Sequence, residues 1–185
     1  MKNLIVFFIL SSLLTAGCVE SEPISKMDGP GNLSVKITDA PFPIEIIESA
    51  EVTFYKAEIW EQYEDSTAKY LLFEDTITVN IFELQNGITE ELAEIEIPAG
   101  DYFHMRLYVV DASITLTGYG TFDMKVPSGP QSGIKIFIDP AVKVRSGLTS
   151  ELLLDFDLSR SFVMKGNMYT PAGIKGFNFK PVIRA

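Results

Sequence analysis

The chain has 185 residues, of which 46% are hydrophobic, and it carries 25 acidic against 15 basic side chains. The formal net charge of −10 excludes nucleic acid as a partner, because phosphate backbones are bound by clustered lysine and arginine side chains. The single cysteine excludes a fold held by disulfides, so a hydrophobic core must stabilise the folded part. The length is that of one domain.

Residues 1–17 have the layout of a lipoprotein signal peptide. Lys2 gives a positive start, an apolar run fills most of residues 4–14, and small residues lead to Cys18. The run is too short for a membrane-spanning helix, which needs about 20 apolar residues. Ala16-Gly17-Cys18 resembles the lipobox of prokaryotic lipoproteins. We therefore expect cleavage before Cys18, acylation of its thiol, and attachment to the extracytoplasmic face of a prokaryotic membrane.

Residues 18–31 are expected to form a tether between this anchor and a single domain at 32–185. The segment has few large apolar residues and ends in Gly29-Pro30-Gly31, a strong breaker of regular structure. Fully extended at about 3.3 Å per residue, the thirteen residues that follow Cys18 reach about 43 Å at most. The domain would therefore stay close to the membrane that holds the anchor.

From Asn32 onward, apolar residues recur with a period of two and turn residues separate the runs, which is the pattern of an all-β domain. A turn at Gly118-Tyr119-Gly120 separates two short strands within 113–126, and one short helical turn is predicted at 89–92. The expected architecture is a two-sheet antiparallel β-sandwich. The remaining strands are predicted at 32–38, 51–60, 70–73, 76–82, 102–110, 133–138, 151–158 and 176–184.

Five stretches, at 33–41, 97–107, 126–135, 154–161 and 179–184, resemble a known family in its own order. They include Thr38-Asp39-Ala40-Pro41 and Ile97-Pro98-Ala99-Gly100-Asp101-Tyr102. The family is that of domain of unknown function 4382, found in prokaryotic lipoproteins. The resemblance implies an extracytoplasmic β-sandwich of transthyretin-like or carbohydrate-binding-like type. It implies no activity, since none is assigned to the family.

Alternation along 102–110 is expected to place two sets of side chains on opposite faces of one strand. The inward set is Phe103, Met105, Leu107 and Val109. The outward set is Tyr102, His104, Arg106 and Tyr108. Aromatic rings beside hydrogen-bonding groups can stack on sugars, so the outward set is a candidate glycan platform. An ordinary surface face is the alternative.

Three aspartates are candidate ligands for Ca²⁺, which binds carboxylate oxygens. Asp39 lies in the Thr-Asp-Ala-Pro turn, whereas Asp155 and Asp157 are two residues apart and share one face of a strand. A structural turn and a solvated strand face explain these residues without a metal. The pair also fits the acid and base of a glycosidase, which requires a set separation across a cleft. No cofactor is expected.

No complete catalytic motif appears in the sequence. His104 is the only histidine, and the signatures of serine nucleophiles, phosphate loops and zinc helices are absent. We therefore expect a non-catalytic module, not an enzyme, that binds a glycan or another surface protein. Two alternatives stay open: an assembly subunit joined to its neighbours by β-augmentation, and a carboxylate-based hydrolase using Asp155 and Asp157.

Overall fold

The computed structural model describes residues 29–39, 45–63, 66–126, 129–167, 169 and 173–185. Cys18, the predicted signal peptide and most of the predicted tether lie outside these residues. In this part of the chain, no helix combines the length and apolar character that a membrane crossing requires.

The described residues are mostly β-strand, which confirms the predicted all-β fold. The strands are β1 (Pro30–Asp39), β2 (Ile47–Tyr63), β3 (Ser66–Phe73), β4 (Ile77–Asn80), β5 (Glu90–Pro98), β6 (Gly100–Leu116), β7 (Gly120–Met124), β8 (Ile134–Val144), β9 (Thr149–Phe156), β10 (Phe162–Gly166), β11 (Ile174–Phe179) and β12 (Ile183–Arg184). Short helical segments are η1 (Ile81–Leu84), α1 (Gly129–Ser132) and α2 (Leu158–Ser161).

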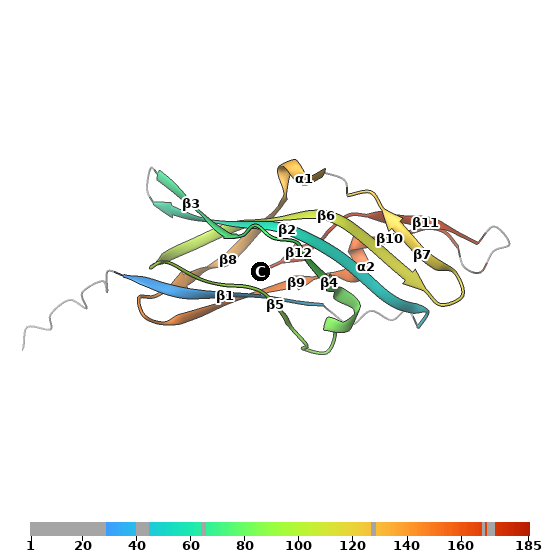
Figure 1. Cartoon of the computed structure of the whole chain (residues 1–185), viewed down its shortest axis with the longest axis horizontal. Coiled ribbons are helices and arrows are strands. Elements are labelled where there is room, and N and C mark those ends of the chain that lie inside the picture. Colours follow the sequence, from blue (N-terminus) through green and yellow to red (C-terminus); the bar gives the residue numbers. More distant parts are fainter. Residues whose placement is uncertain (1–28, 40–44, 64–65, 127–128, 168, 170–172) are drawn as a thin grey trace, which may run out of the picture.

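Two packed sheets form a sandwich (Figure 1). Sheet A has the strand order β12-β9-β1-β5, and sheet B has the order β3-β2-β6-β7, with β4 also paired to β2 and β8 to β6. One pair departs from the predicted antiparallel arrangement, because β1 and β9 run parallel. The hairpin β10–β11 is a separate pair that contacts β7 through Phe122 and Phe177, whose ring centroids are 5.5 Å apart.

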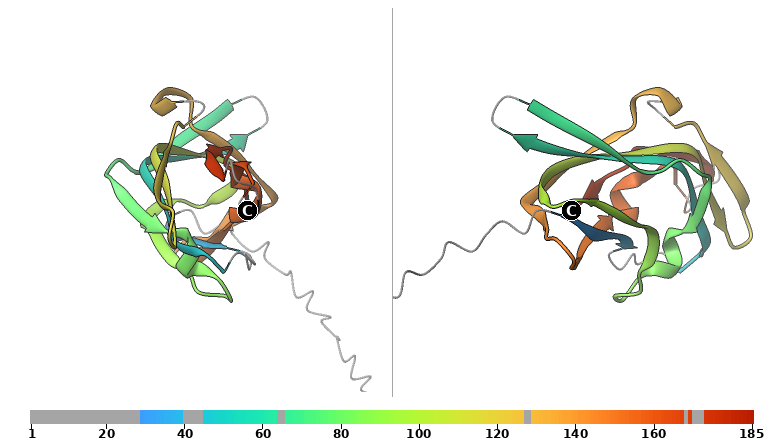
Figure 2. Two further views of the ribbon diagram at one scale, coloured as in Figure 1. Left: turned by 90° about the vertical axis from the view of Figure 1, so that its right-hand side faces the viewer. Right: turned by 60° about the vertical axis from the view of Figure 1, so that its left-hand side comes forward.

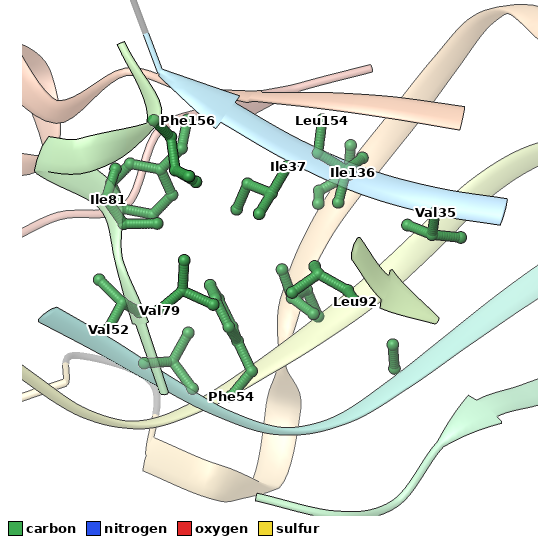
Figure 3. Packing of buried hydrophobic residues seen from close by; sticks show 14 of the residues in the cluster. Val35, Ile37, Val52, Phe54, Val79, Ile81, Leu92, Ile136, Leu154 and Phe156 are labelled. Atoms are coloured by element: carbon green, nitrogen blue, oxygen red, sulfur yellow. The ribbon is translucent and has the colours of Figure 1, made fainter. Parts of the chain in front are cut away.

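The core lies between the two sheets, where the inward side chains of both meet (Figure 3). Sheet A contributes Val35 and Ile37, and sheet B contributes Val52 and Phe54, all almost fully buried. Phe156 joins Phe162 and Phe179 in an aromatic cluster beside α2. Figure 2 shows the two layers from other directions. The apolar side chains that alternate along the strands of both sheets meet in this core, and burying them holds the two sheets together as a sandwich.

Several predicted boundaries differ from the structure. Residues 89–92, predicted as a helical turn, belong instead mainly to β5, which pairs with β1 along the edge of sheet A. Leu92 is buried there, so packing outweighs the weak local cap signal. The strand predicted at 76–82 ends at Asn80, where η1 begins, and β10 was not predicted. Pro30 and Gly31 belong to β1 and not to the tether.

A β-bulge at Phe103 makes the predicted faces of Tyr102 and Phe103 wrong, whereas Met105, Leu107 and Val109 are buried as predicted. Trp60 pairs with His104 and Glu61 pairs with Tyr102, so Phe103 is an extra residue with no partner on β2. One extra residue reverses which face the following side chains occupy. Tyr102 is therefore fully buried, whereas Phe103, predicted to be inward, is 42% exposed.

We predict that Gly31→Ala lowers the free energy of unfolding by about 1–3 kcal/mol, the usual cost of overpacking a well-packed site. A methyl group on this residue would lie 2.1 Å from the Arg145 carbonyl oxygen and 3.0 Å from that of Leu148. Urea unfolding of the chain from Val19 onward measures the effect. Asn32→Ala, which alters the neighbouring exposed side chain, should change the stability by less than about 0.5 kcal/mol. Equal effects of the two substitutions would contradict the prediction.

Candidate functional site

Three rings form a row across the outer face of sheet B, here called the aromatic row (Trp60, His104 and Phe137). The three residues are cross-strand neighbours, because His104 on β6 pairs with Trp60 on β2 and with Phe137 on β8. The Trp60 and His104 rings stack with centroids 4.8 Å apart and planes 12° apart, and the Phe137 centroid lies 6.5 Å from that of His104. Phe137 is 68% exposed. Trp60 and His104 are half-buried, so Phe137 is the most exposed ring of the row.

Basic side chains surround the aromatic row. The Arg106 guanidinium lies 5.6 Å from the centre of the Trp60 ring, and the Lys135 ammonium lies 4.6 Å from that of Phe137. Lys69 on β3 is the cross-strand neighbour of Trp60. Both cation–ring distances fall within the range of favourable cation–π contacts. This face is therefore basic, although the whole chain carries a net charge of −10.

Glu58 is the acid that lies under this face, and it is only 5% exposed. Its carboxylate accepts hydrogen bonds from Lys69 Nζ at 2.9 Å and from the Tyr108 hydroxyl at 2.8 Å, and Lys56 Nζ lies 3.3 Å away. Burial alone would raise the pKa of Glu58, but these hydrogen bonds outweigh burial and lower the pKa below its ordinary value of 4.5. Glu58 is thus a buried, ionised carboxylate with three partners.

The Tyr108 hydroxyl belongs to this network. The sequence predicted that its ring faces solvent, and this prediction is wrong. The side chain is 8% exposed, and Gly133, next to α1, lies against its ring. Burial, and then the hydrogen bond to Glu58, raise the pKa of the Tyr108 hydroxyl. Tyr108 therefore helps to hold Glu58 in place beneath the exposed face.

Arg106 and His104 remain at the surface as predicted, both half-buried. Arg106 donates a hydrogen bond to the Ser132 carbonyl oxygen at 3.3 Å, while its buried Nε has no hydrogen-bond partner in the described part of the chain. Burial, and then the positive charges of Lys135 and Arg106, lower the pKa of His104 below 6.5. His104 is thus mainly neutral at pH 7 and can stack on Trp60 without charge repulsion from Arg106.

Tyr102, like Tyr108, is a member of the predicted platform that the structure buries. Its hydroxyl donates to the Pro98 carbonyl oxygen at 2.8 Å, and its ring packs edge-on against Tyr70 at 5.8 Å. The bulge at Phe103 turns it, like Glu61 on β2, toward the interior of the sandwich. Tyr102 therefore ties the start of β6 to the end of β5 and does not belong to the exposed face.

The structure assigns structural contacts to two of the three aspartates that were predicted as Ca²⁺ ligands. Asp39 is buried, and its Oδ1 accepts a hydrogen bond from the Leu158 amide at 2.9 Å. Asp157 caps α2 by accepting from the Arg160 amide at 3.0 Å. Asp155 lies on β9 of sheet A. Across the described residues, no group of three or more His, Cys, Asp or Glu side chains is arranged to hold a metal ion. Asp39 and Asp157 instead help to fix the junction of β1, β9 and α2.

The sequence analysis missed the residues that complete the exposed face, namely Trp60, Phe137, Lys135, Lys69 and Glu58. Their signal is present, because alternation within 51–60 places Glu58 and Trp60 on one face, and Lys135 and Phe137 alternate with buried isoleucines. The register that brings the two sets together across β6 cannot be read from alternation within each strand.

The family model described as "Domain of unknown function (DUF4382)" matches residues 30–181. The match covers every strand of the two sheets except β12, including the strands that carry the aromatic row. Neither a curated protein nor a solved structure matches the chain.

We predict that Glu58→Gln lowers the free energy of unfolding by about 1–3 kcal/mol at pH 7, because it removes a buried charge to which Lys56, Lys69 and Tyr108 are bound. A lowered pKa means that this stabilisation is fully present above pH 4.5 and is lost as the pH falls through the pKa of the folded state. Urea unfolding of both proteins between pH 3 and pH 7 measures the difference, which should shrink below pH 4.5.

Glu74→Gln is the matched control for this substitution. Its carboxylate lies 3.7 Å from the Lys56 ammonium, but its side chain is 59% exposed. An exposed ion pair contributes about 0–1 kcal/mol, so this control should be nearly neutral. A Glu58→Gln protein as stable as the control at pH 7 would contradict the role assigned to Glu58.

Proposed function

Since the chain belongs to the DUF4382 family, whose description names no activity, we propose a function from its own exposed face: a lipid-anchored, non-catalytic module that binds a glycan outside the cell. The observation that carries this proposal is the aromatic row. Its rings lie across three neighbouring strands, and Phe137 is 68% exposed. Aromatic faces combine a large apolar area with few rotatable bonds, and the apolar faces of sugar rings pack on them.

The surroundings of the row support a binding role. Arg106, Lys69 and Lys135 supply donors that can meet sugar hydroxyls beside the stacked rings. The Trp60–His104 stack and the hydrogen bonds to Glu58 hold the face in one arrangement. A face ordered before the ligand arrives loses less entropy on binding. An extended sheet surface also suits a polymer chain better than a small molecule, which binds in a concave pocket.

The candidate carboxylates support the non-catalytic part of the proposal. Asp39 and Asp157 accept hydrogen bonds from backbone amides, as structural caps do. Glu58 is engaged by two lysines and a tyrosine. A glycosidase requires two carboxylates that face one bond from opposite sides. Asp39, Asp157 and Glu58 are instead engaged in contacts that hold the fold together.

The anchor part of the proposal rests on the lipobox-like Ala16-Gly17-Cys18. Acylation with two or more chains gives stable membrane attachment, which an acidic surface with a net charge of −10 would not provide by electrostatics. The first described residues, Gly29 and Pro30, accept backbone hydrogen bonds from Ala99 and Gly147 through their carbonyl oxygens. This is the end of the sandwich at which β6 starts, four residues before His104.

We predict that Phe137→Ala and Trp60→Ala each weaken glycan binding by about 0.5–1.5 kcal/mol, or between twofold and tenfold in Kd, because each removes one stacking ring. A glycan array screened with the chain from Val19 onward identifies the binding saccharides, and calorimetric titration then measures Kd. Leu153→Ala is the matched control, since Leu153 is an exposed apolar residue on sheet A. Equal losses for all three variants, or no bound saccharide at all, would refute the proposal.

We also predict that Cys18→Ala moves the protein from the membrane fraction to the soluble extracytoplasmic fraction, because the substitution removes the thiol that carries the acyl chains. Fractionation of cells producing the full chain, followed by metabolic labelling with a radioactive fatty acid, measures both effects. Ser21→Ala, three residues further on, is the control and should remain labelled and membrane-bound. A labelled, membrane-bound Cys18→Ala protein would show that another element holds the chain to the membrane.

A further inference from the structure

Two basic side chains beside the aromatic row have no acidic partner. Arg106 on β6 and Lys135 on β8 are cross-strand neighbours, so their Cβ atoms lie about 4.5–5.5 Å apart. Among the described residues, no carboxylate lies within ion-pair distance of either side chain. Two adjacent positive charges without a counter-ion repel each other and therefore favour a negatively charged ligand.

The nearest acid on this face does not neutralise them. Arg106 is the cross-strand neighbour of Glu58, yet the Glu58 carboxylate is bound by Lys56, Lys69 and Tyr108. The opposite outer face, that of sheet A, differs in sign. There Lys36 forms an ion pair with Glu151 and lies close to further glutamates on β5, and Arg184 on β12 is the cross-strand neighbour of Asp155. Arg106 and Lys135 therefore lie side by side next to the aromatic row with no ion-pair partner among the described residues.

Building on the proposed glycan-binding function, we propose that this face binds a polysaccharide whose sugars carry carboxylate groups, that is, a chain containing uronic acid units. Arg106 and Lys135 bind the carboxylates, while the sugar rings pack on Trp60 and Phe137. The planar guanidinium of Arg106 matches the geometry of a carboxylate.

The charge of the rest of the protein favours a ligand of modest charge density. Anionic lipid bilayers, nucleic acids and heavily sulfated chains present many negative charges close together, and the chain as a whole has a net charge of −10. Each such ligand would be attracted by two cations and repelled by the surrounding acids. A uronic acid has one charge per sugar, so Arg106 and Lys135 can neutralise the units that they contact while neighbouring rings stack.

The test uses polygalacturonate and the same polymer with its carboxyl groups methyl-esterified. The ester keeps the sugar rings and removes the charge, so the two polymers separate the contribution of Arg106 and Lys135 from that of the aromatic row. Calorimetric titration with the chain from Val19 onward should give at least tenfold weaker binding of the ester. Binding of the acidic polymer should weaken as salt is raised from 50 to 500 mM, because the charged contacts are exposed to solvent.

Substitutions then assign the effect to residues. Lys135→Gln, an exposed position, should weaken binding of polygalacturonate at least threefold and leave the ester unaffected, and Arg106→Gln should act in the same way. Lys165→Gln is the matched control, because Lys165 is an exposed lysine on β10, outside the two sheets. Arg106→Lys keeps the charge and should restore part of the affinity, which separates the loss of charge from a loss of folding.

The outcomes distinguish the two proposals. Equal binding of both polymers, sensitive to Phe137→Ala but not to Lys135→Gln, would overturn the carboxylate inference and leave the glycan proposal standing. Binding of neither polymer, together with failure of every saccharide on the array, would overturn both. Binding of phosphatidylglycerol vesicles that is lost in Lys135→Gln, without binding of polygalacturonate, would assign the face to a lipid surface and overturn the inference.

Discussion

Pairing between β2 and β6, each 17 residues long, is the constraint on which the rest of the structure depends. These strands are the centre of sheet B, and β3, β4, β7 and β8 all attach to one or the other. The bulge at Phe103 shifts their register so that Trp60 and His104 face solvent while Glu61 and Tyr102 face the core. Without this extra residue, the side chains before it on β6 would occupy the opposite face.

Glu58 influences both the charge and the rigidity of the exposed face. A buried carboxylate is costly unless it is paired, and Lys56, Lys69 and Tyr108 supply the pairing. Because the Glu58 carboxylate is bound by these three groups, it does not neutralise the positive charges of Arg106 and Lys135 beside the aromatic row. The net charge of −10 describes the chain as a whole and conceals this local reversal of sign. A basic face on an acidic domain restricts the ligands that can approach it.

The sequence predicted the all-β class, most of the strands and the turn at Gly118, because these follow from alternation and turn residues within short segments. It misplaced Tyr102 and Phe103, because the local sequence does not reveal a bulge when the two adjacent residues are both aromatic. It proposed Asp39 and Asp157 as metal ligands, whereas they cap backbone amides that come from distant or adjacent segments. Trp60, Phe137 and Lys135 were missed because only the register across β6 brings them together.

The parallel pair of β1 and β9 has a consequence for the order of assembly. β1 lies in the middle of sheet A, and its pairing with β9 cannot form until the segment that begins at Thr149 has been synthesised. Contacts between such distant segments form slowly, because a long loop must close first. Sheet B, in contrast, contains only residues from 47 to 144. Because the N-terminal part of the chain is made first, the strands of sheet B can pair before sheet A has received its central strand β9.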